Sequence, residues 1–176
     1  MCNEISCCFT GHRPDHLPWG REEGHPDCEA FYLRLTQATE EKIGLGCRIF
    51  YSGMAQGVDM MAAQIVLGLR AAHPEWGLEL IAVCPHEHQA ARWSQEDRKL
   101  YHLLLDLADQ VVVLEKDYTP YCYHQRNRYM VDHCAHMIAG FDGISKGGTS
   151  STVQYARRKG REILEVSPYK MGTVMP

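Results

Sequence analysis

The chain has 176 residues, of which 45% are hydrophobic and 23% are charged, and its formal net charge at neutral pH is -4. This length suits one domain, and this composition excludes an intrinsically disordered chain. The negative charge excludes a general attraction to nucleic acid or to an anionic membrane, so phosphate binding must be local and nucleic acid is an unexpected partner. The sequence contains neither a run of about 18 apolar residues nor a signal peptide. We therefore expect a cytoplasmic protein with no membrane partner.

Six short runs of apolar and β-branched residues predict strands, and segments with helical spacing lie between them. The first strand is followed by a long irregular loop over residues 11–27, which contains three prolines, and then by a helix over about 28–43. Nearly continuous apolar strands that alternate with helices are typical of a parallel sheet covered on both faces. The predicted fold class is therefore α/β and doubly wound, with a mostly parallel sheet. The predicted strands are 5–10, 48–52, 78–83, 110–114, 136–141 and 162–166.

The eight cysteines are scattered along the chain, and no two of them have C-x-x-C spacing. A chain of this length does not need disulfides, so we expect most of them to be buried thiols. The nearest clusters of metal-ligating residues are His86-Glu87-His88, after the third strand, and His133-Cys134-Ala135-His136, and neither has structural-zinc spacing. We predict no metal site and no cofactor.

Polar and glycine-rich motifs follow the first two strands, at the sheet edge where open α/β folds bind ligands. The first is Thr10-Gly11-His12-Arg13-Pro14, which is either an anion-binding corner or an ordinary turn with a solvated arginine. The second is Ser52-Gly53-Met54-Ala55-Gln56-Gly57-Val58-Asp59, directly before a helix. Its glycines would let backbone N–H groups approach an anion, although it is neither a Walker loop nor a G-x-G-x-x-G fingerprint. Asp59 is either a ribose ligand or a first-turn helix residue.

Two further motifs flank the fifth strand. Gln125-Arg126-Asn127-Arg128-Tyr129-Met130 lies near the start of the preceding helix, where Arg126 can clamp a phosphate unless the segment is a solvated charged turn. Lys146-Gly147-Gly148-Thr149-Ser150-Ser151-Thr152 leads into the next helix and is the stronger phosphate cradle, with a plain helix cap by Thr149 or Ser150 as the alternative. The candidate ligand-binding residues are Thr10, Gly11, His12, Arg13, Ser52, Gly53, Gly57, Asp59, Arg126, Asn127, Gly147, Gly148, Thr149 and Thr152.

At these residues the sequence resembles the SLOG superfamily, which includes the DprA/Smf DNA-processing proteins and the Lonely Guy phosphoribohydrolases. The motifs at 10–14, 52–59, 126–130 and 147–152 are similar, in the same order, to those of the YpsA-like family of unknown function. The resemblance implies a Rossmann-like domain, which we place at 1–166, and glycine loops that bind a nucleotide or nucleotide-derived ligand. Residues 167–176 contain two prolines and a glycine and show no periodicity, so we expect an irregular tail there. Relatives of this fold commonly pair, which makes a homodimer a candidate state.

Two departures from the relatives bear on catalysis. Gln154 lies where the Lonely Guy enzymes carry a catalytic glutamate, and a neutral amide cannot act as a carboxylate base. Arg126, by contrast, matches an arginine of those enzymes. Met54 replaces a glycine that relatives often carry, and its side chain is expected to narrow the pocket or to cover the base. The leading hypothesis is therefore a sensor-like binding domain for a nucleotide-derived ligand, and the departure at Gln154 argues against catalysis without deciding it.

Two alternative functions remain open at the level of sequence. One is an N-glycosidase or related hydrolase acting on a nucleoside monophosphate or an NAD-like substrate, with Asp59, Glu87 or Asp142 as the carboxylate. The other is single-stranded DNA binding, as in DprA-like relatives, although the acidic composition argues against it. The local basic cluster that would serve this function is expected at a helix C-terminus, where cations are favoured. It consists of Arg157, Arg158, Lys159 and Arg161.

Overall fold

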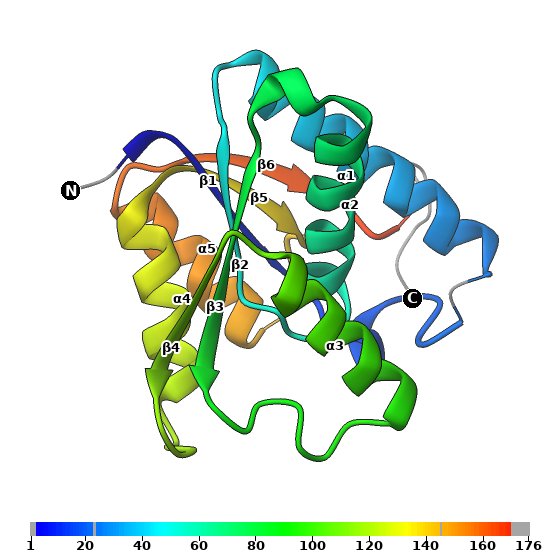
Figure 1. Ribbon diagram of the computed structural model, residues 1–176, viewed down its shortest axis with the longest axis vertical. Helices are drawn as coiled ribbons and strands as arrows, with labels where there is room; N and C mark the ends of the chain where they lie inside the picture. The colour runs from blue at the N-terminus through cyan, green and yellow to red at the C-terminus, as the bar shows by residue number, and fades with distance from the viewer. Residues whose placement is uncertain (1–2, 23, 145, 170–176) are drawn as a thin grey trace.

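The computed structural model describes residues 3–22, 24–144 and 146–169 (Figure 1). Within these ranges six strands form one parallel sheet in the order β4-β3-β2-β1-β5-β6, and α-helices connect them. The predicted doubly wound α/β class is confirmed, and every predicted strand is present. The strands are β1 (Asn3–Gly11), β2 (Ile49–Ser52), β3 (Glu79–His86), β4 (Gln110–Glu115), β5 (Cys134–Gly140) and β6 (Glu162–Val166), and the helices are α1 (Pro26–Gly44), α2 (Val58–Ala72), α3 (Gln95–Leu107), α4 (Cys122–His133) and α5 (Gly148–Arg158).

The order of the strands reverses between β1 and β5. From β1 the chain winds outward through β2 and β3 to β4, and it then returns to place β5 on the other side of β1. The two strands are paired in register to their last residues, Gly11 opposite Gly140. In open α/β sheets this reversal leaves a crevice at the carboxyl ends of the strands, where ligands bind. The sheet topology therefore directs the search for a site to the ends of β1 and β5.

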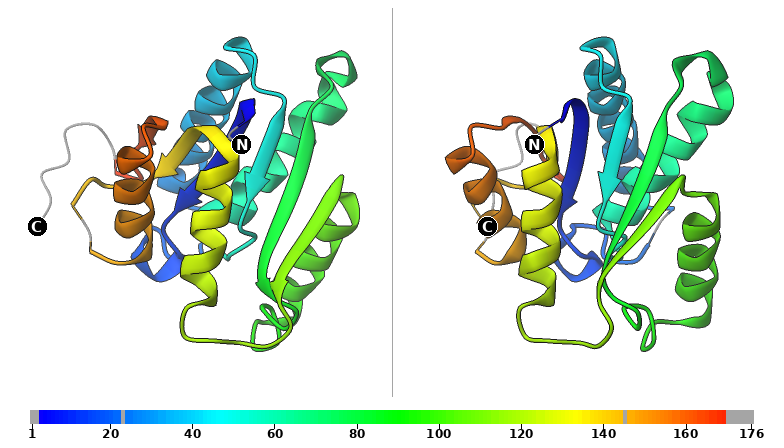
Figure 2. Two further views of the ribbon diagram at one scale, coloured as in Figure 1. Left: turned by 90° about the vertical axis from the view of Figure 1, so that its left-hand side faces the viewer. Right: turned by 60° about the vertical axis from the view of Figure 1, so that its left-hand side comes forward.

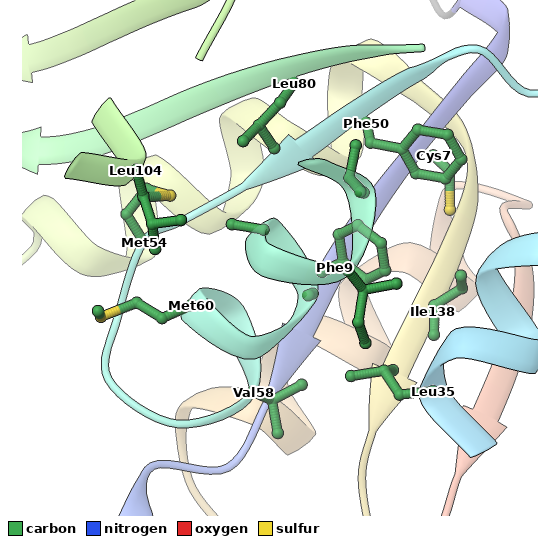
Figure 3. Close-up of a cluster of buried hydrophobic side chains, with 14 of the residues drawn as sticks. Cys7, Phe9, Leu35, Phe50, Met54, Val58, Met60, Leu80, Leu104 and Ile138 are labelled. Carbon is green, nitrogen blue, oxygen red and sulfur yellow. The ribbon is translucent and has the colours of Figure 1, made fainter. Parts of the chain in front are cut away.

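Helices cover both faces of the sheet, with α1, α2 and α3 on one face and α4 and α5 on the other (Figure 2). The larger core lies under the first three helices, where the rings of Phe9 and Phe50 stack with their centroids 5.8 Å apart (Figure 3). A second core lies under α4 and α5 and includes Met130 and Met137. Burial on both faces explains why β3 is buried at every residue after Glu79, and why the strands appear in the sequence as continuous apolar runs.

Three segments differ from the expectation or refine it. Strand β3 continues beyond the predicted end at residue 83 as far as His86, because His86 still pairs with Glu115 of β4. The loop over 11–27 contains a short 3-10 helix, Pro14–His16, and its Trp19 is buried in the larger core. The expected tail begins at Ser167, whose carbonyl accepts a hydrogen bond from Arg34, and residues 170–176 of that tail lie outside the described residues.

The structure also bears on the cysteines and on the membrane. All the cysteines in the described ranges are buried thiols, as expected. None of the helices in the described part of the chain is long and apolar enough to cross a membrane.

Candidate functional site

The ends of β1 and β5 lie against the first turn of α2. A Cβ atom at Gly140 would lie 2.8 Å from both γ-carbons of Val58, and one at Gly11 would overlap the same side chain. The backbone N–H of Val58 donates a hydrogen bond of 3.2 Å to the carbonyl of His12. Glycine at both strand ends thus lets α2 pack directly on the reversal point of the sheet.

A polar cavity of about 210 Å³ opens beyond these strand ends. Ten of the fourteen candidate residues line it, whereas Ser52, Gly53, Gly57 and Thr152 do not. The structure therefore brings together parts of all four motifs. The lining consists of Thr10, Gly11, His12, Arg13, His16, Ala55, Asp59, Tyr123, Arg126, Asn127, Lys146, Gly147, Gly148, Thr149 and Ser150.

Arg126 forms the buried floor of the polar cavity with Asp59. Its Nη1 donates to the carbonyl of Gly53 and lies 3.3 Å from Oδ2 of Asp59, while its Nε has no hydrogen-bond partner in the described structure. Burial raises the pKa of Asp59, an effect that Arg126 and the N–H of Ala55 partly offset. Burial likewise lowers the pKa of Arg126, and Asp59 partly offsets that shift. An arginine remains protonated under these conditions, so the guanidinium is a fixed cation with donors to spare.

His12 lies at the side of the cavity beside a second carboxylate. Its Nε2 is 3.6 Å from Oδ1 of Asp142, and both side chains are almost completely buried. Burial lowers the pKa of His12 below the ordinary value of 6.5, and Asp142 partly offsets the shift. Burial thus favours the neutral imidazole, which could accept a proton from a bound ligand.

The first turn of α5 is open toward the cavity. Gly147 precedes the helix with φ of 134°, a conformation that other residues rarely adopt, and as the N-cap residue it has no side chain with which to cap the helix. A Cβ atom at Gly147 or Gly148 would meet no atom of the described structure within 4 Å. The Thr149 hydroxyl, which the alternative interpretation assigned to capping, instead donates to the carbonyl of Gly11 at 2.9 Å. Next to Gly147 and Gly148, the start of α5 thus borders space that the described protein atoms do not fill.

The loop over residues 53–57 differs from the α5 turn because protein atoms fill it. A Cβ atom at Gly53 would overlap the guanidinium of Arg126, and one at Gly57 would lie 2.5 Å from the carbonyl oxygen of His12. The Ser52 hydroxyl donates to the carbonyl of Asp59 at 2.8 Å and accepts from the N–H of Met54. The glycines of this loop therefore allow close approach by Arg126 and by the backbone of His12, and not by a ligand.

Met54 does not narrow the polar cavity, contrary to the expectation from sequence. Its side chain is fully buried in the larger core (Figure 3), and it does not line the cavity. Its φ of 54° lies in the left-handed region, where glycine is favoured. The backbone therefore has the conformation expected of a glycine, whereas the side chain turns inward.

Sequence reasoning missed Tyr123 and His16 as cavity residues. The Tyr123 ring lies between two guanidinium groups, with Cζ of Arg13 at 5.0 Å and Cζ of Arg126 at 6.0 Å from its centroid. Tyr123 precedes Arg126 by three residues on α4, and this spacing alone could have placed both on one face of a helix. His16 belongs to the 3-10 helix within the loop that was expected to be irregular, and no signal in the sequence pointed to it.

Other candidates lie away from the polar cavity. His86 is buried against the rings of Tyr118 and Tyr123, whereas His88 and Glu87 are exposed. Gln154 is exposed and donates to the hydroxyl of Ser150, so the position where relatives carry a glutamate is outside the cavity lining. Among the described residues no group of three or more histidine, cysteine, aspartate or glutamate side chains could hold a metal ion.

The basic cluster at the C-terminal end of α5, as expected from the sequence, is largely engaged within the protein. Arg157 pairs with Glu165, and Lys159 lies 3.1 Å from Asp132. Arg161 donates to the carbonyl of Val131 at 2.9 Å, at the end of α4. These contacts leave little of the cluster for a DNA backbone.

A larger cavity of about 530 Å³ lies on the other side of the 53–57 loop. Its walls are mainly apolar and include Trp19, Tyr32 and Met60. On its rim, Asp97 accepts hydrogen bonds from Gln56 at 2.6 Å and from Arg21 at 3.4 Å. Arg21, the cation in this lining, is therefore already paired with a carboxylate. The smaller polar cavity, which contains Arg13, Arg126 and Lys146, is better suited to an anion.

Comparison with known proteins gives a family for nearly the whole chain. A model of the YpsA family, described as the YspA SLOG family, matches residues 7–173. The uncharacterized SPbeta prophage-derived protein YoqJ of Bacillus subtilis is 29% identical over 68% of this chain and 76% of its own length. UPF0398 proteins of Bacillus cereus and Bacillus thuringiensis are 25% and 26% identical, each over 86% of this chain and 82% of the relative. These names state no ligand and no reaction.

Proposed function

The chain belongs to the YpsA family of SLOG proteins, and on that premise we propose that it binds the phosphate of a nucleotide-derived ligand at the first turn of α5. The observation that carries the proposal is the N-terminus of this helix, which no side chain of the described residues caps and which opens into a cavity lined by Arg13, Arg126 and Lys146. Free backbone N–H groups and the helix dipole favour an anion there, and the three cations add charge.

The two arginines of the cavity have different proposed roles in binding the phosphate. Arg126 is held by Asp59 and the Gly53 carbonyl, so its donors are oriented before a ligand arrives. Arg13 is exposed and lies over Tyr123, from where it can approach the outer side of a phosphate. Two candidates outside the lining hold residues of the cavity in place, because Gly53 accepts a hydrogen bond from Arg126 and Thr152 accepts one from Asn127.

The size of the cavity limits how much of the ligand it encloses. Sites for drug-sized ligands usually have volumes of roughly 300–1,000 Å³. The polar cavity, at about 210 Å³, is smaller. We therefore propose that it holds a phosphate and part of a sugar, and that the rest of the ligand lies outside it.

Isothermal titration calorimetry with the four nucleoside 5′-monophosphates tests the proposal. Replacement Gly148→Asp places a carboxylate at the proposed phosphate position, where a Cβ atom would meet no atom of the described residues within 4 Å. It is expected to weaken binding at least tenfold, or about 1.4 kcal/mol. Gly24→Asp is the matched control, because Gly24 is likewise open and lies away from the cavity. Equal affinity of the two variants, or no binding to the wild type, would contradict the proposal.

The pair of His12 and Asp142 favours a second candidate function, a hydrolase acting at the same site. A buried histidine close to a carboxylate, here with 3.6 Å between Nε2 of His12 and Oδ1 of Asp142, is an arrangement that moves protons in many enzymes. The calorimetry samples serve as the assay, since a hydrolase would release free base from the nucleotides over hours. Intact nucleotides after incubation with the wild type would remove this candidate.

A further inference from the structure

A second polar groove lies beside the polar cavity, between α4 and α5. These two helices are neighbours on one face of the sheet (Figure 2). The groove has a volume of about 230 Å³ and is lined by His124, Asn127, Arg128, Ser151, Thr152, Tyr155 and Arg158. We call it the α4–α5 groove.

The groove and the polar cavity are adjacent parts of one surface. Asn127 lines both of them. The α5 segment is continuous across the boundary, because Ser150 lines the cavity and Ser151 lines the groove. Between them, the side-chain amide of Asn127 donates to the Thr152 hydroxyl at 2.8 Å. A ligand that leaves the cavity past Asn127 would therefore enter the groove.

Positive charge in the groove has no acidic partner. Cζ of Arg128 and Cζ of Arg158 lie 5.3 Å and 5.8 Å from the centroid of the Tyr155 ring, and neither forms an ion pair in the described structure. The Tyr155 hydroxyl donates to Asp132 at 3.0 Å, which fixes the ring between the two cations. Lys159 also lies near this ring, but it pairs with Asp132.

We infer that the α4–α5 groove is a second anion subsite, in which Arg128 and Arg158 hold a second phosphate of the ligand whose first phosphate lies at α5. This inference rests on the proposed function and narrows its ligand to a nucleotide with two separated phosphates, such as a nucleoside bisphosphate or a dinucleotide. Two arginines and the hydroxyl of Ser151 suit one phosphate, whereas the Thr152 hydroxyl already donates to the carbonyl of Gly148. A longer strand would need further cations, and Arg157, Lys159 and Arg161 are all engaged within the protein.

Calorimetry at low ionic strength with paired ligands tests this inference. Each of the four nucleoside 5′-monophosphates is compared with the 3′,5′-bisphosphate of the same nucleoside, so that the contribution of the base cancels. The wild type is expected to bind the bisphosphate at least tenfold more tightly for the preferred base. The double variant Arg128→Gln/Arg158→Gln is expected to lose this preference and to keep its affinity for the monophosphate.

A charge-matched control separates local contacts from the overall field. Arg98→Gln/Arg157→Gln changes the net charge equally outside the groove, and it should retain the preference for the bisphosphate. Equal binding of both ligands by the wild type would overturn the second subsite and leave the proposed function standing, whereas no binding of either would overturn both. A further tenfold gain with single-stranded DNA of about ten nucleotides would also overturn the inference, in favour of a nucleic acid strand.

Discussion

Two effects act in opposite directions at Met54. The left-handed backbone at φ 54° costs a non-glycine residue about 1–2 kcal/mol. The side chain is fully buried in the larger core, and truncation of such a side chain costs about 2–5 kcal/mol. The free energy gained by packing the side chain thus exceeds the free energy lost to backbone strain. This difference explains how methionine is tolerated at a position suited to glycine.

This balance predicts an unusual order of stability among truncated variants. Met54→Ala loses the packing and keeps the strain, whereas Met54→Gly loses the packing and relieves the strain. The glycine variant should therefore be the more stable of the two by about 1 kcal/mol in urea denaturation. At Met137, which is equally buried in a strand without positive φ, the alanine variant should be the more stable. If the alanine variant were the more stable at position 54 as well as at position 137, the backbone at Met54 would not be strained.

The candidate site residues differ in how far sequence alone could place them. Glycine at positions 53 and 148 predicted a close approach to the backbone. At Gly53 the structure shows such an approach, by the side chain of Arg126. The sequence could not say what approaches, because the guanidinium of Arg126 comes from a helix 73 residues further along the chain. Tyr123 could have been predicted from helical spacing, because it precedes Arg126 by three residues, but it lies outside the motif at 125–130.

At the scale of elements, the strands were the most predictable part of the fold. Their apolar runs are long because both faces of the sheet are covered, and all six were located within a few residues. The end of β3 was placed too early, since Pro85 and the histidine cluster after it resemble a turn. A proline at this point is compatible with the strand, because the ladder with β4 resumes at His86.

An ion pair between a buried lysine and a glutamate that is 59% exposed connects α1 to the edge strand β6. The side chain of Lys42 is 2% exposed, and its Nζ lies 2.6 Å from Oε1 of Glu162. The hydrogen bond from Lys42 lowers the pKa of Glu162 below its ordinary value of 4.5, and His136 contributes to the shift. Because the folded-state pKa is depressed, the pair stabilises the fold above pH 4.5, and this contribution is lost as the pH falls through the folded-state pKa.

Replacement Glu162→Gln tests the importance of this pair. It leaves a buried ammonium group without its carboxylate, and it should lower the free energy of unfolding at pH 7 by roughly 1–2 kcal/mol, between the effects known for exposed and buried pairs. Glu165→Gln on the same strand is the control, because Glu165 pairs with the exposed Arg157 and should matter less. Denaturation at pH 7 and pH 3 should show the difference between the variants shrinking at low pH. An equal loss in both variants would contradict the role of Lys42.

At the scale of the whole molecule, the sequence predicted the sheet edge and the fold but not the geometry of the site. Four motifs separated by up to about 140 residues pointed to one edge, and parts of all four line one polar cavity. The predicted resemblance to SLOG proteins is confirmed by the family match. The two glycine loops looked equivalent as sequences, and only the three-dimensional packing distinguishes the filled loop at 53–57 from the open turn at Gly148.

The most direct test of the central claim is to observe the backbone amides during a titration with inorganic phosphate, by ¹H–¹⁵N correlation NMR of the labelled protein. The account predicts that the largest shifts occur at Gly148, Thr149 and Ser150, with smaller effects at Gly53 and Gly57. Largest shifts at residues 53–60, or shifts spread over the surface without saturation, would contradict a phosphate site at the first turn of α5.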